Sequence, residues 1–398
     1  MTTFDLTSLI SLNNIEKNEN KEITIKKFNL NYSDTCTDVL YIMKYNKEYI
    51  NLSNIKTLGC LRSIITNKTD ILCFSPQKSV NFEDFDYSDK ENIEITEFYE
   101  GTMINMFYNS TCKDWEISTK GNIGAKCKFY ENQKRTFRAL FLEALNEYDI
   151  LLSTLDTTKC YSFVLQHPEN RIVIPFKKIR LILTNIYHID GFKISNLSIK
   201  EIIKIHPEFE KLLPEPLNNI KYESIEDLKN IFNGLNLDYN LMGVVLINNK
   251  TGERTKLRNP NYEYVRRLKG NSSRIQFQYY NLRYNGKVKE YLKYYPKDKE
   301  QFKILRNDLH IWTMQLWKNY INCFIKKKGV LKDYPYQYRP HMWALHQIYF
   351  NECISKKEYI SKKRVIDYIN KLEPPRLMFA MNYNLHKRDI DKIKTQIE

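Results

Sequence analysis

The sequence predicts an α+β protein, with antiparallel sheets and helices in its first part and helices alone in its last part. Residues 93–128 alternate apolar and polar side chains with the period of two that half-buried strands show. Beyond about Pro260 the apolar residues recur at helical spacing. The chain has 398 residues, of which 42% are hydrophobic, so it is long enough for two domains with buried cores. We expect these domains at 1–260 and 261–398.

Short strands and hairpins are expected to dominate the first domain. Residues 1–35 are weakly patterned, and we expect a lead-in strand or helix there. The remaining strands are expected at 39–52 around a turn at 46–47, at 58–74 around a turn at 67–70, at 93–119 with a turn at Glu100-Gly101, at 159–174, at 179–188, and at 241–257 around a turn at 248–252.

Two helices interrupt these strands. Residues 132–148 predict an amphipathic helix because their apolar side chains share one face, namely Phe137, Leu140, Phe141, Ala144 and Leu145. A shorter helix is expected at 225–232, and a surface loop at 83–94.

Four helical segments are expected in the second domain, at 261–295, 299–328, 339–354 and 362–372. Gly329, Pro335 and Pro340 separate them, and the Pro374-Pro375 pair is expected to end the last one. The apolar residues expected to form the core of this bundle include Trp312, Met314, Leu316, Trp317, Trp343 and Leu345.

The formal net charge of +15 favours a polyanionic partner such as nucleic acid. The alternative is an even Lys bias that reflects an AT-rich genome. The eight cysteines are scattered without a C-x-x-C pair, so we expect reduced thiols and no metal site. No apolar run is long enough to span a membrane, and the N-terminus lacks the features of a signal peptide. A cytoplasmic protein is therefore expected.

The segment Glu97-Phe98-Tyr99-Glu100-Gly101-Thr102, with Trp115 to Gly121 after it, resembles a motif pair of RNA ligases and related nucleotidyltransferases. Their pattern is roughly E-K-x-D-G-S followed by W-x-x-x-T-R-G. The resemblance implies a nucleotidyltransferase (ATP-grasp-like ligase) domain at 1–260. A helical C-terminal domain also occurs in phage-type ligases that reseal cut tRNA. Because Phe98 stands where these enzymes have the attacking lysine, the resemblance also implies that their first chemical step is lost.

In that family a lysine attacks the α-phosphate of ATP, AMP passes to an RNA 5′-phosphate, and a 3′-hydroxyl displaces the AMP. Cations are needed at each step because each moves a negatively charged phosphoryl group. The resemblance implies ten residues that contact nucleotide or phosphate: Arg62, Lys78, Glu100, Gly101, Thr102, Lys120, Gln166, His167, Lys256 and Arg258. For Arg62 an ordinary strand-end charge is the alternative, and for His167 a structural role.

Two carboxylates of the family pattern are missing as well. The strand glutamate is replaced by Val164 and the metal-binding glutamate by Met242, and neither side chain can bind Mg²⁺. We therefore expect no metal site and no cofactor. ATP and Mg²⁺ would be used only if another lysine replaced the lost nucleophile, for which Lys78 and Lys126 are the candidates.

The second domain interleaves basic residues with tyrosines, a composition that suits single-stranded RNA. The alternative is a bundle whose tyrosines are core and whose lysines are solvated. The basic residues expected to contact RNA are Arg266, Arg267, Lys269, Lys326, Lys327 and Lys328.

These observations predict an RNA-binding protein that resembles an RNA ligase and is catalytically inactive, with RNA and other proteins of a larger complex as partners. One alternative is an active ATP-dependent ligase that uses Lys78 or Lys126. Another is a structural or scaffold protein of a viral complex. The resemblance together with the Lys-, Asn- and Ile-rich composition suggests a large DNA virus as the source, with the protein in the host cytoplasm or the virion.

Overall fold

The computed structural model describes residues 2–10, 12, 15–17, 19–33, 36–130, 133–215, 217, 220–234 and 236–397. Two compact units make up the chain, Met1–Arg266 and Arg267–Glu398. We call them the sheet unit and the helical unit. The sheet unit contains every strand that the structure describes, and the helical unit contains helices and turns. The architecture is thus mixed α+β with antiparallel sheets and a helical C-terminal region, as predicted.

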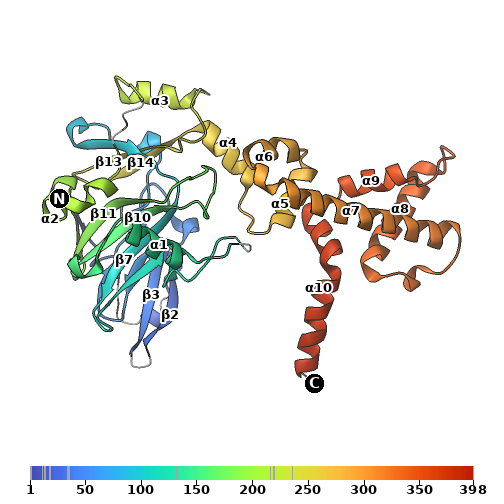
Figure 1. Ribbon diagram of the computed structural model, residues 1–398, viewed down its shortest axis with the longest axis horizontal. Helices are drawn as coiled ribbons and strands as arrows, with labels where there is room; N and C mark the ends of the chain where they lie inside the picture. The colour runs from blue at the N-terminus through green and yellow to red at the C-terminus, as the bar shows by residue number, and fades with distance from the viewer. Residues whose placement is uncertain are drawn as a thin grey trace. The chain divides into compact units, whose positions relative to one another are not determined.

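A seven-stranded antiparallel sheet forms the centre of the sheet unit (Figure 1). Its strands, in spatial order, are β1 (Thr2–Asp5), β12 (Lys193–Asn196), β11 (Arg180–Asp190), β10 (Lys159–Gln166), β7 (Thr102–Asn109), β8 (Asp114–Thr119) and β9 (Asn122–Ile123).

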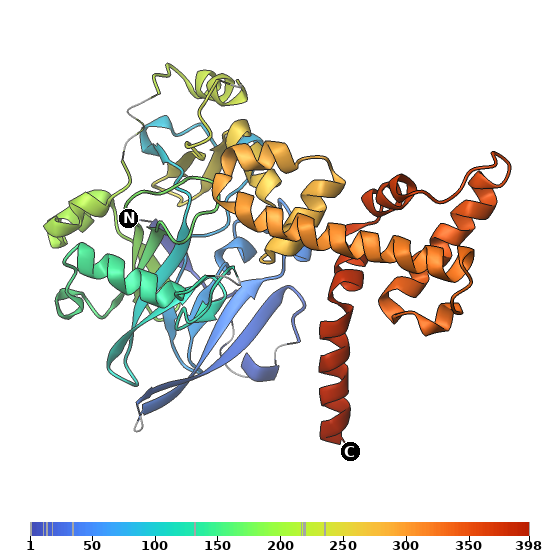
Figure 2. The ribbon, with the colours of Figure 1, turned by 45° about the vertical axis from the view of Figure 1, so that its right-hand side comes forward.

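The alternating side chains of β7 divide between the two faces of this sheet. Ile104 and Met106 join a core with α1 (Phe137–Glu147) and α2 (Ile199–Ile205), whereas Phe107 joins a second core on the opposite face. A four-stranded sheet covers that opposite face, with the strand order β2 (Ile23–Ser33), β3 (Cys36–Tyr45), β4 (Ile64–Thr66) and β5 (Ile71–Cys73). Figure 2 shows the long β2–β3 hairpin in blue.

A three-stranded sheet completes this unit, with the order β14 (Arg254–Arg258), β13 (Gly243–Asn248) and β6 (Ile93–Glu97). Its apolar face packs with α3 (Ile225–Asn233). Between β6 and β7 the chain crosses from this sheet to the seven-stranded sheet. Gly101 lies at the crossing, where an added Cβ would come within 2.6 Å of the Leu165 carbonyl oxygen. Only glycine allows β7 to approach β10 so closely.

Antiparallel and crossed helices build the helical unit, and α4 (Pro260–Lys269) leads into it. They are α5 (Ile275–Tyr284), α6 (Val288–Tyr294), α7 (Lys299–Tyr320), α8 (Arg339–Ile348), α9 (Lys362–Asn370) and α10 (Pro374–Ile397). Both α7 and α8 end in a π-helical turn, at Ile321–Ile325 and Tyr349–Cys353.

The amphipathic helix at 132–148 is confirmed as α1. Its buried side chains are the five expected, and the Thr136 hydroxyl accepts a hydrogen bond from the Ala139 N–H to start it. Residue 132, where we expected this helix to begin, lies outside the described residues. The hairpins expected at 58–74 and 241–257 are also confirmed, with turns where the polar residues predicted them.

The lead-in strand or helix expected within residues 1–35 is confirmed as strand, because this segment contains β1 and the eleven-residue β2, which pairs with β3. Two other expectations about elements were wrong. Residues 39–52 form one strand and a 3-10 turn instead of two strands, because the Asn46 side chain accepts from the Glu48 N–H and starts that turn. The prolines at 374 and 375 begin α10 instead of ending a helix, since a first-turn proline lacks only an N–H that would have no partner.

The expectation of reduced thiols was wrong for two cysteines. Cys36 on β3 and Cys112 in the β7–β8 turn form a disulfide with their Cα atoms 5.9 Å apart. Their separation of 76 residues gave no sign of this pairing. The other six cysteines are free. Among the described residues, none of the helices combines the length and the hydrophobicity that crossing a membrane requires.

Candidate phosphate-binding site

A cavity of about 500 Å³ opens in the sheet unit beside β14. We call it the cationic cavity, because five of its lining residues are basic and one is acidic. Its lining residues are Tyr45, Arg62, Lys78, Ser79, Val80, Asn81, Phe82, Glu83, Lys120, Lys256 and Arg258.

The two basic residues on β14 share one face of that strand. Residues two apart on a strand point the same way, so Lys256 and Arg258 face the cavity together. Arg254 is two residues earlier in the same phase, and its charge acts on both Lys256 and Arg62. We did not single out Arg254 from the sequence, although the alternation R-T-K-L-R contained the signal.

Three other segments supply the remaining cations. The segment with Lys78 lies along β14, where the Val80 N–H donates to the Arg254 carbonyl (2.9 Å). Arg62 follows a 3-10 turn, and its guanidinium donates to the Pro76 carbonyl (3.1 Å). Lys120 follows β8, and its amine lies 5.5 Å from the centre of the Tyr45 ring. Segments far apart in sequence therefore converge on one cavity.

Most basic residues of the cationic cavity have no acidic partner among the described residues. Arg258 pairs with Glu263 at 2.5 Å. For Arg62, Lys78, Lys120 and Lys256, no acidic group lies within ion-pair distance in the part of the chain that the structure describes. The acidic lining residue, Glu83, is exposed to solvent. Uncompensated, partly buried cations are costly unless an anion from outside neutralises them. The arrangement therefore suits a phosphate ligand.

Burial and mutual repulsion lower the pKa values of the cavity's amines. Burial, followed by the charges of Arg254 and Arg62, lowers the pKa of Lys256 to about 6. Burial together with Arg62, Lys47 and Lys44 lowers the pKa of Lys120 to about 8. Lys256 is therefore largely neutral at pH 7 in the free protein. A phosphate in the cavity would favour its protonated form.

Phe98 contacts this group of cations from the side of β6. The amine of Lys256 lies 4.6 Å from the centre of the Phe98 ring, and the guanidinium carbon of Arg258 lies 5.8 Å from it. The Phe98 N–H donates to the Gly243 carbonyl (2.9 Å), which fixes the residue beside β13. The position implied for the attacking lysine is thus next to the cations, but it carries an aromatic ring.

The other five residues implied by the resemblance lie outside the lining of this cavity. Glu100 is only 2% exposed, and its carboxylate accepts hydrogen bonds from the N–H groups of Val173 (3.0 Å) and Ile174 (3.1 Å). The Tyr262 hydroxyl also donates to it. Burial raises the pKa of Glu100 in spite of these donors. Gly101 provides the close strand approach described above.

Thr102, Gln166 and His167 hold the turn after β10. The Asn170 amide donates to the Thr102 hydroxyl (2.8 Å), and the Gln166 amide donates to the Glu100 carbonyl (2.8 Å). Nδ1 of His167 accepts from the Glu169 N–H (3.1 Å). Thr102 and Gln166 connect the β6–β7 crossing to residues 166–174, and His167 bonds within that segment. Each of these three side chains therefore has a structural role.

The two candidate lysines are placed differently. Lys78 lines the cationic cavity. Lys126 is exposed and is absent from the cavity's lining.

The cationic cavity contains few groups that could bind a divalent metal. The cavity offers one carboxylate, the exposed Glu83, and Val164 and Met242 stand where the resemblance implies glutamates. No group of three or more His, Cys, Asp or Glu residues suited to a metal occurs among the described residues. The donor set does not fit Mg²⁺, which prefers several hard oxygen ligands.

The basic residues expected to contact RNA fall into two groups. Arg266 is 3.3 Å from Glu263, and the Lys269 amine donates to the Tyr291 hydroxyl (2.9 Å), so both have partners within the protein. Arg267 is exposed, and so are Lys326, Lys327 and Lys328.

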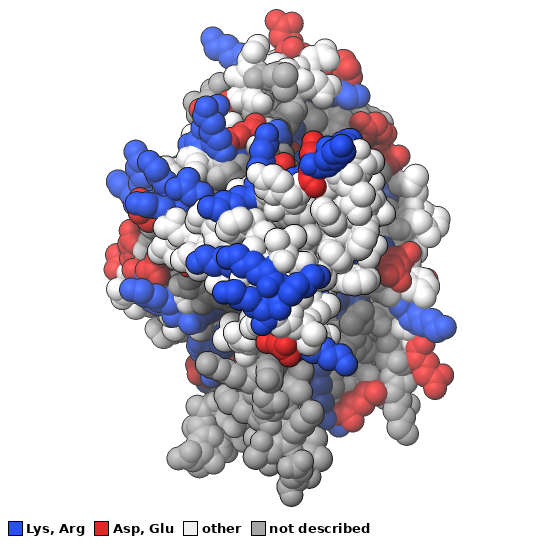
Figure 3. All heavy atoms as spheres, turned by 90° about the vertical axis from the view of Figure 1, so that its right-hand side faces the viewer, with Lys and Arg blue, Asp and Glu red and all other residues white. Residues whose placement is uncertain are grey.

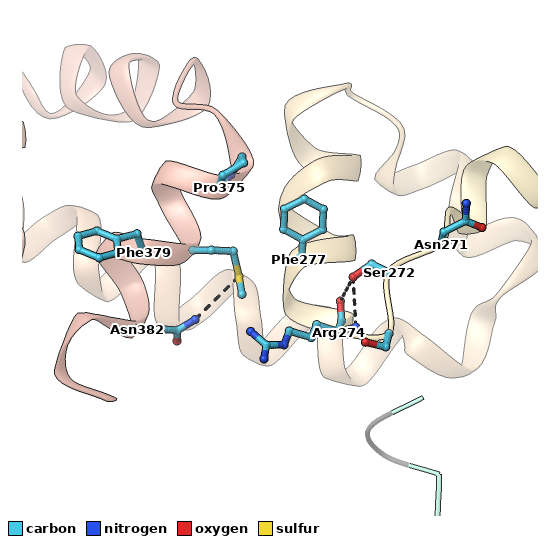
Figure 4. Close-up of a pocket in the computed structure, with 9 residues that line it drawn as sticks. Asn271, Ser272, Arg274, Phe277, Pro375, Phe379 and Asn382 are labelled. Atoms are coloured by element: carbon cyan, nitrogen blue, oxygen red, sulfur yellow. Dashed lines mark hydrogen bonds between the residues drawn. The ribbon is translucent and has the colours of Figure 1, made fainter. Parts of the chain in front are cut away.

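A second cavity, of about 470 Å³, lies in the helical unit between the start of α5 and α10 (Figure 4). None of the predicted site residues lines it. Its lining combines amides, hydroxyls and apolar groups with a single guanidinium, that of Arg274. It therefore lacks the concentrated charge of the cationic cavity.

The comparison with known sequences gives one partial similarity to an RNA ligase, from Rhodothermus phage RM378. The two sequences are 28% identical over 109 residues, which are 25% of this chain and 24% of the phage protein. No protein-family profile matches the chain. The match supports an RNA-ligase-like relationship for that part of the chain.

Solved structures give broader but weaker similarities. A putative ATP-dependent DNA ligase from Aquifex aeolicus has a TM-score of 0.39 and 14% identity, over 83% of this chain and 78% of that one. A Naegleria gruberi RNA ligase variant with AMP and Mn has a TM-score of 0.35 and 12% identity, over 50% of this chain and 64% of that one.

Proposed function

We propose that this chain is an RNA-ligase-like protein that binds RNA through the cationic cavity and does not carry out the ligase's nucleotide transfer. The observation that supports this most is the cavity itself, where four basic residues without acidic partners among the described residues (Arg62, Lys78, Lys120 and Lys256) line one space and the Lys256 amine lies beside the Phe98 ring. Such a site attracts phosphate, and it lacks an amine at the position implied for the nucleophile. A terminal phosphate of RNA is the ligand that the cavity suits best.

Recognition in this proposal is mainly electrostatic. Arg62 and Arg258 present planar guanidinium groups that can form paired hydrogen bonds to phosphate oxygens, and Lys78 and Lys120 add point charges. Each phosphate contact releases counterions, so affinity falls as salt rises, with a slope of about −0.7 per contact for single strands.

The test uses full-length protein free of nucleic acid and a fluorescently labelled single-stranded RNA with a 5′-phosphate. Lys78→Ala and Lys120→Ala are expected to raise the Kd several-fold and to make the salt dependence shallower. Lys126→Ala is the matched control, because this lysine is exposed and outside the cavity. Unchanged binding by both cavity variants would refute the proposal.

Intact-mass measurement tests the absence of nucleotide transfer. After incubation with ATP or GTP and Mg²⁺, the mass is expected to stay unchanged. A gain of one nucleoside monophosphate that disappears in Lys78→Ala would instead establish the active ligase, with Lys78 as its nucleophile, since Lys78 is the one of the two candidates that lines the cavity.

A further inference from the structure

The region where α7 and α8 end, at the right of Figure 1, contains two π-helical turns. Phe324 of the first turn stacks on His346 of α8, with ring centres 3.9 Å apart and planes inclined by 18°. The two helix ends are therefore in contact. π-helical turns are rare and occur frequently at functional sites, because they displace side chains from regular helical positions.

Three aromatic side chains follow one another along this face of α8 and its π turn. Trp343, His346 and Phe350 are spaced i, i+3 and i+7, which places them on the same side. We call them the aromatic ladder. The ring centres of Trp343 and His346 are 6.2 Å apart, and those of His346 and Phe350 are 4.7 Å apart.

The ladder is open to solvent at both ends. Trp343 and Phe350 are each 53% exposed, while Met342 and Leu345 on the adjacent, core-facing side of α8 are buried. Our expectation that Trp343 belongs to the bundle core was therefore wrong. Met342 and Leu345 already fill the core-facing side of α8, so the neighbouring tryptophan must point outwards.

The middle ring of the ladder has unused hydrogen-bonding capacity. Nδ1 of His346 is buried and has no hydrogen-bond partner among the described residues. Burial and the nearby charge of Lys327 lower the pKa of His346, which favours the neutral form of its ring. A neutral imidazole can stack on a flat ligand and can donate or accept one hydrogen bond at its edge.

Positive charge lies beside the ladder, since Lys327 is close enough to His346 to affect its pKa. Lys326, Lys327 and Lys328 follow the first π turn, all three are exposed, and no acidic group of the described chain lies within ion-pair distance of them. Segments 321–333 and 343–357 together contain six lysines and two acidic residues. Both acids already have partners, since Asp333 accepts from the Val330 N–H and Glu352 pairs with Arg364. Figure 3 shows lysine and arginine side chains gathered beside a neutral area on the face at this side of the molecule.

We propose that the aromatic ladder stacks unpaired bases of single-stranded RNA while Lys326, Lys327 and Lys328 contact its phosphates. Every base has a flat face, so stacking tolerates any sequence, and adjacent cations follow the backbone. A duplex keeps its bases stacked on one another and cannot offer them to the ladder. The proposal rests on the proposed RNA-binding function and adds a second, strand-selective site to it. A protein partner would suit the exposed rings, but it would have to neutralise three adjacent lysines.

Affinity measurements with the full-length protein provide the first test. Trp343→Ala combined with Phe350→Ala is expected to raise the Kd for a labelled single-stranded oligouridylate roughly tenfold, as alanine substitution of stacking residues does elsewhere. Affinity for a blunt duplex is expected to stay unchanged. Phe379→Ala is the matched control, because this phenylalanine is 54% exposed in the same unit and lies outside the ladder. Unchanged single-strand affinity in the double variant would overturn the proposal.

Tryptophan fluorescence provides a direct reading of stacking. Oligouridylate is expected to quench part of the emission of the wild-type protein, and Trp343→Phe is expected to remove that quenching while it keeps most of the affinity. Quenching that persists in Trp343→Phe would contradict the proposal that bases stack on the aromatic ladder. If Lys78→Ala and Lys120→Ala weaken RNA binding but the ladder variants do not, the ladder fails and the cationic cavity stands. If the wild-type protein binds no RNA, both proposals fail.

Discussion

The amine of Lys256 lies 4.6 Å from the centre of the Phe98 ring, close enough for a cation–π contact. Arg258 approaches the same ring. The electron-rich face of the ring stabilises positive charge in a cavity where basic residues outnumber acidic ones. Phe98, at the position that the resemblance implies for the attacking lysine, thus offsets part of the repulsion between Lys256 and Arg258.

The substitution Phe98→Lys tests this relationship. It adds a further amine beside Lys256 and Arg258, so we expect the midpoint of thermal unfolding to fall by several degrees. Phe98→Leu is the control, because it removes the ring without adding charge, and its effect is expected to be smaller. Neither variant is expected to gain nucleotide mass with ATP and Mg²⁺, since the exposed Glu83 is the one carboxylate among the cavity's described lining residues. A covalent nucleotide on Phe98→Lys would show that the lysine alone was missing.

RNA binding is expected to depend on pH through Lys256. Its pKa of about 6 in the free protein must rise when a phosphate binds, so binding takes up a proton. Affinity should therefore increase as the pH falls from 8 towards 6 and level off below that. Lys256→Met is expected to flatten this profile, and the control Lys126→Met to leave it unchanged. If RNA affinity changed equally with pH in the wild-type protein and in Lys256→Met, the pH dependence could not be assigned to Lys256.

Lys256 should also affect the stability of the ligand-free protein. Its folded pKa of about 6 is below the ordinary 10.5, so between these values the unfolded chain binds more protons than the folded chain. The contribution of this amine to the free energy of unfolding therefore rises as the pH increases between these two pKa values. At pH 7 we expect Lys256→Met to raise the thermal midpoint. A lower midpoint in Lys256→Met than in the wild-type protein would show that the buried amine is stabilised by a partner.

Glu100 is expected to matter for stability and not for RNA affinity. Glu100→Ala leaves the N–H groups of Val173 and Ile174 without their acceptor, at roughly 1–3 kcal/mol for each buried donor. We expect the free energy of unfolding to fall by about 3 kcal/mol. The folded fraction should bind RNA as before, because the carboxylate does not line the cavity. Urea unfolding and RNA titration check the two parts, with the exposed Glu91→Ala as the control.

The Cys36–Cys112 bond predicts a redox-dependent stability. It closes a loop of 76 residues, for which the chain-entropy estimate is about 4.5 kcal/mol. We expect Cys36→Ser to lower the free energy of unfolding by up to this amount without reductant and to have little effect with reductant. Cys127→Ser, at a free and partly buried cysteine, should be neutral in both conditions. Alkylation of all eight cysteines in native, unreduced protein would exclude the bond.

Local patterns were sufficient to predict a large part of the fold. The five apolar residues of α1 share a face because helical spacing puts them there, and the hairpins at 58–74 and 241–257 turn where Asn, Asp and Gly favour turns. The resemblance implied that Arg62, Lys78, Lys120, Lys256 and Arg258 contact nucleotide or phosphate, and all five line one cavity. Lys256 and Arg258 face it together because residues two apart on a strand point the same way.

Features that depend on partners distant in the sequence were beyond prediction. The Cys36–Cys112 bond depends on where two hairpin ends meet. The roles of Glu100 and Gln166 depend on which backbone groups approach them. Trp343 looked like a core residue until Met342 and Leu345 were found to occupy the buried side of α8.

The sequence by itself determined the local elements, the excess of positive charge and the presence of phenylalanine at position 98, where the resemblance implies a lysine. These depend on residue identity and on spacing along the chain, which short-range geometry fixes. Only the tertiary structure decided which cations share a cavity, how far burial lowers the pKa of Lys256, and which aromatic rings remain in solvent. The reason is physical: burial, desolvation and repulsion depend on distances between segments that the order of residues alone does not set.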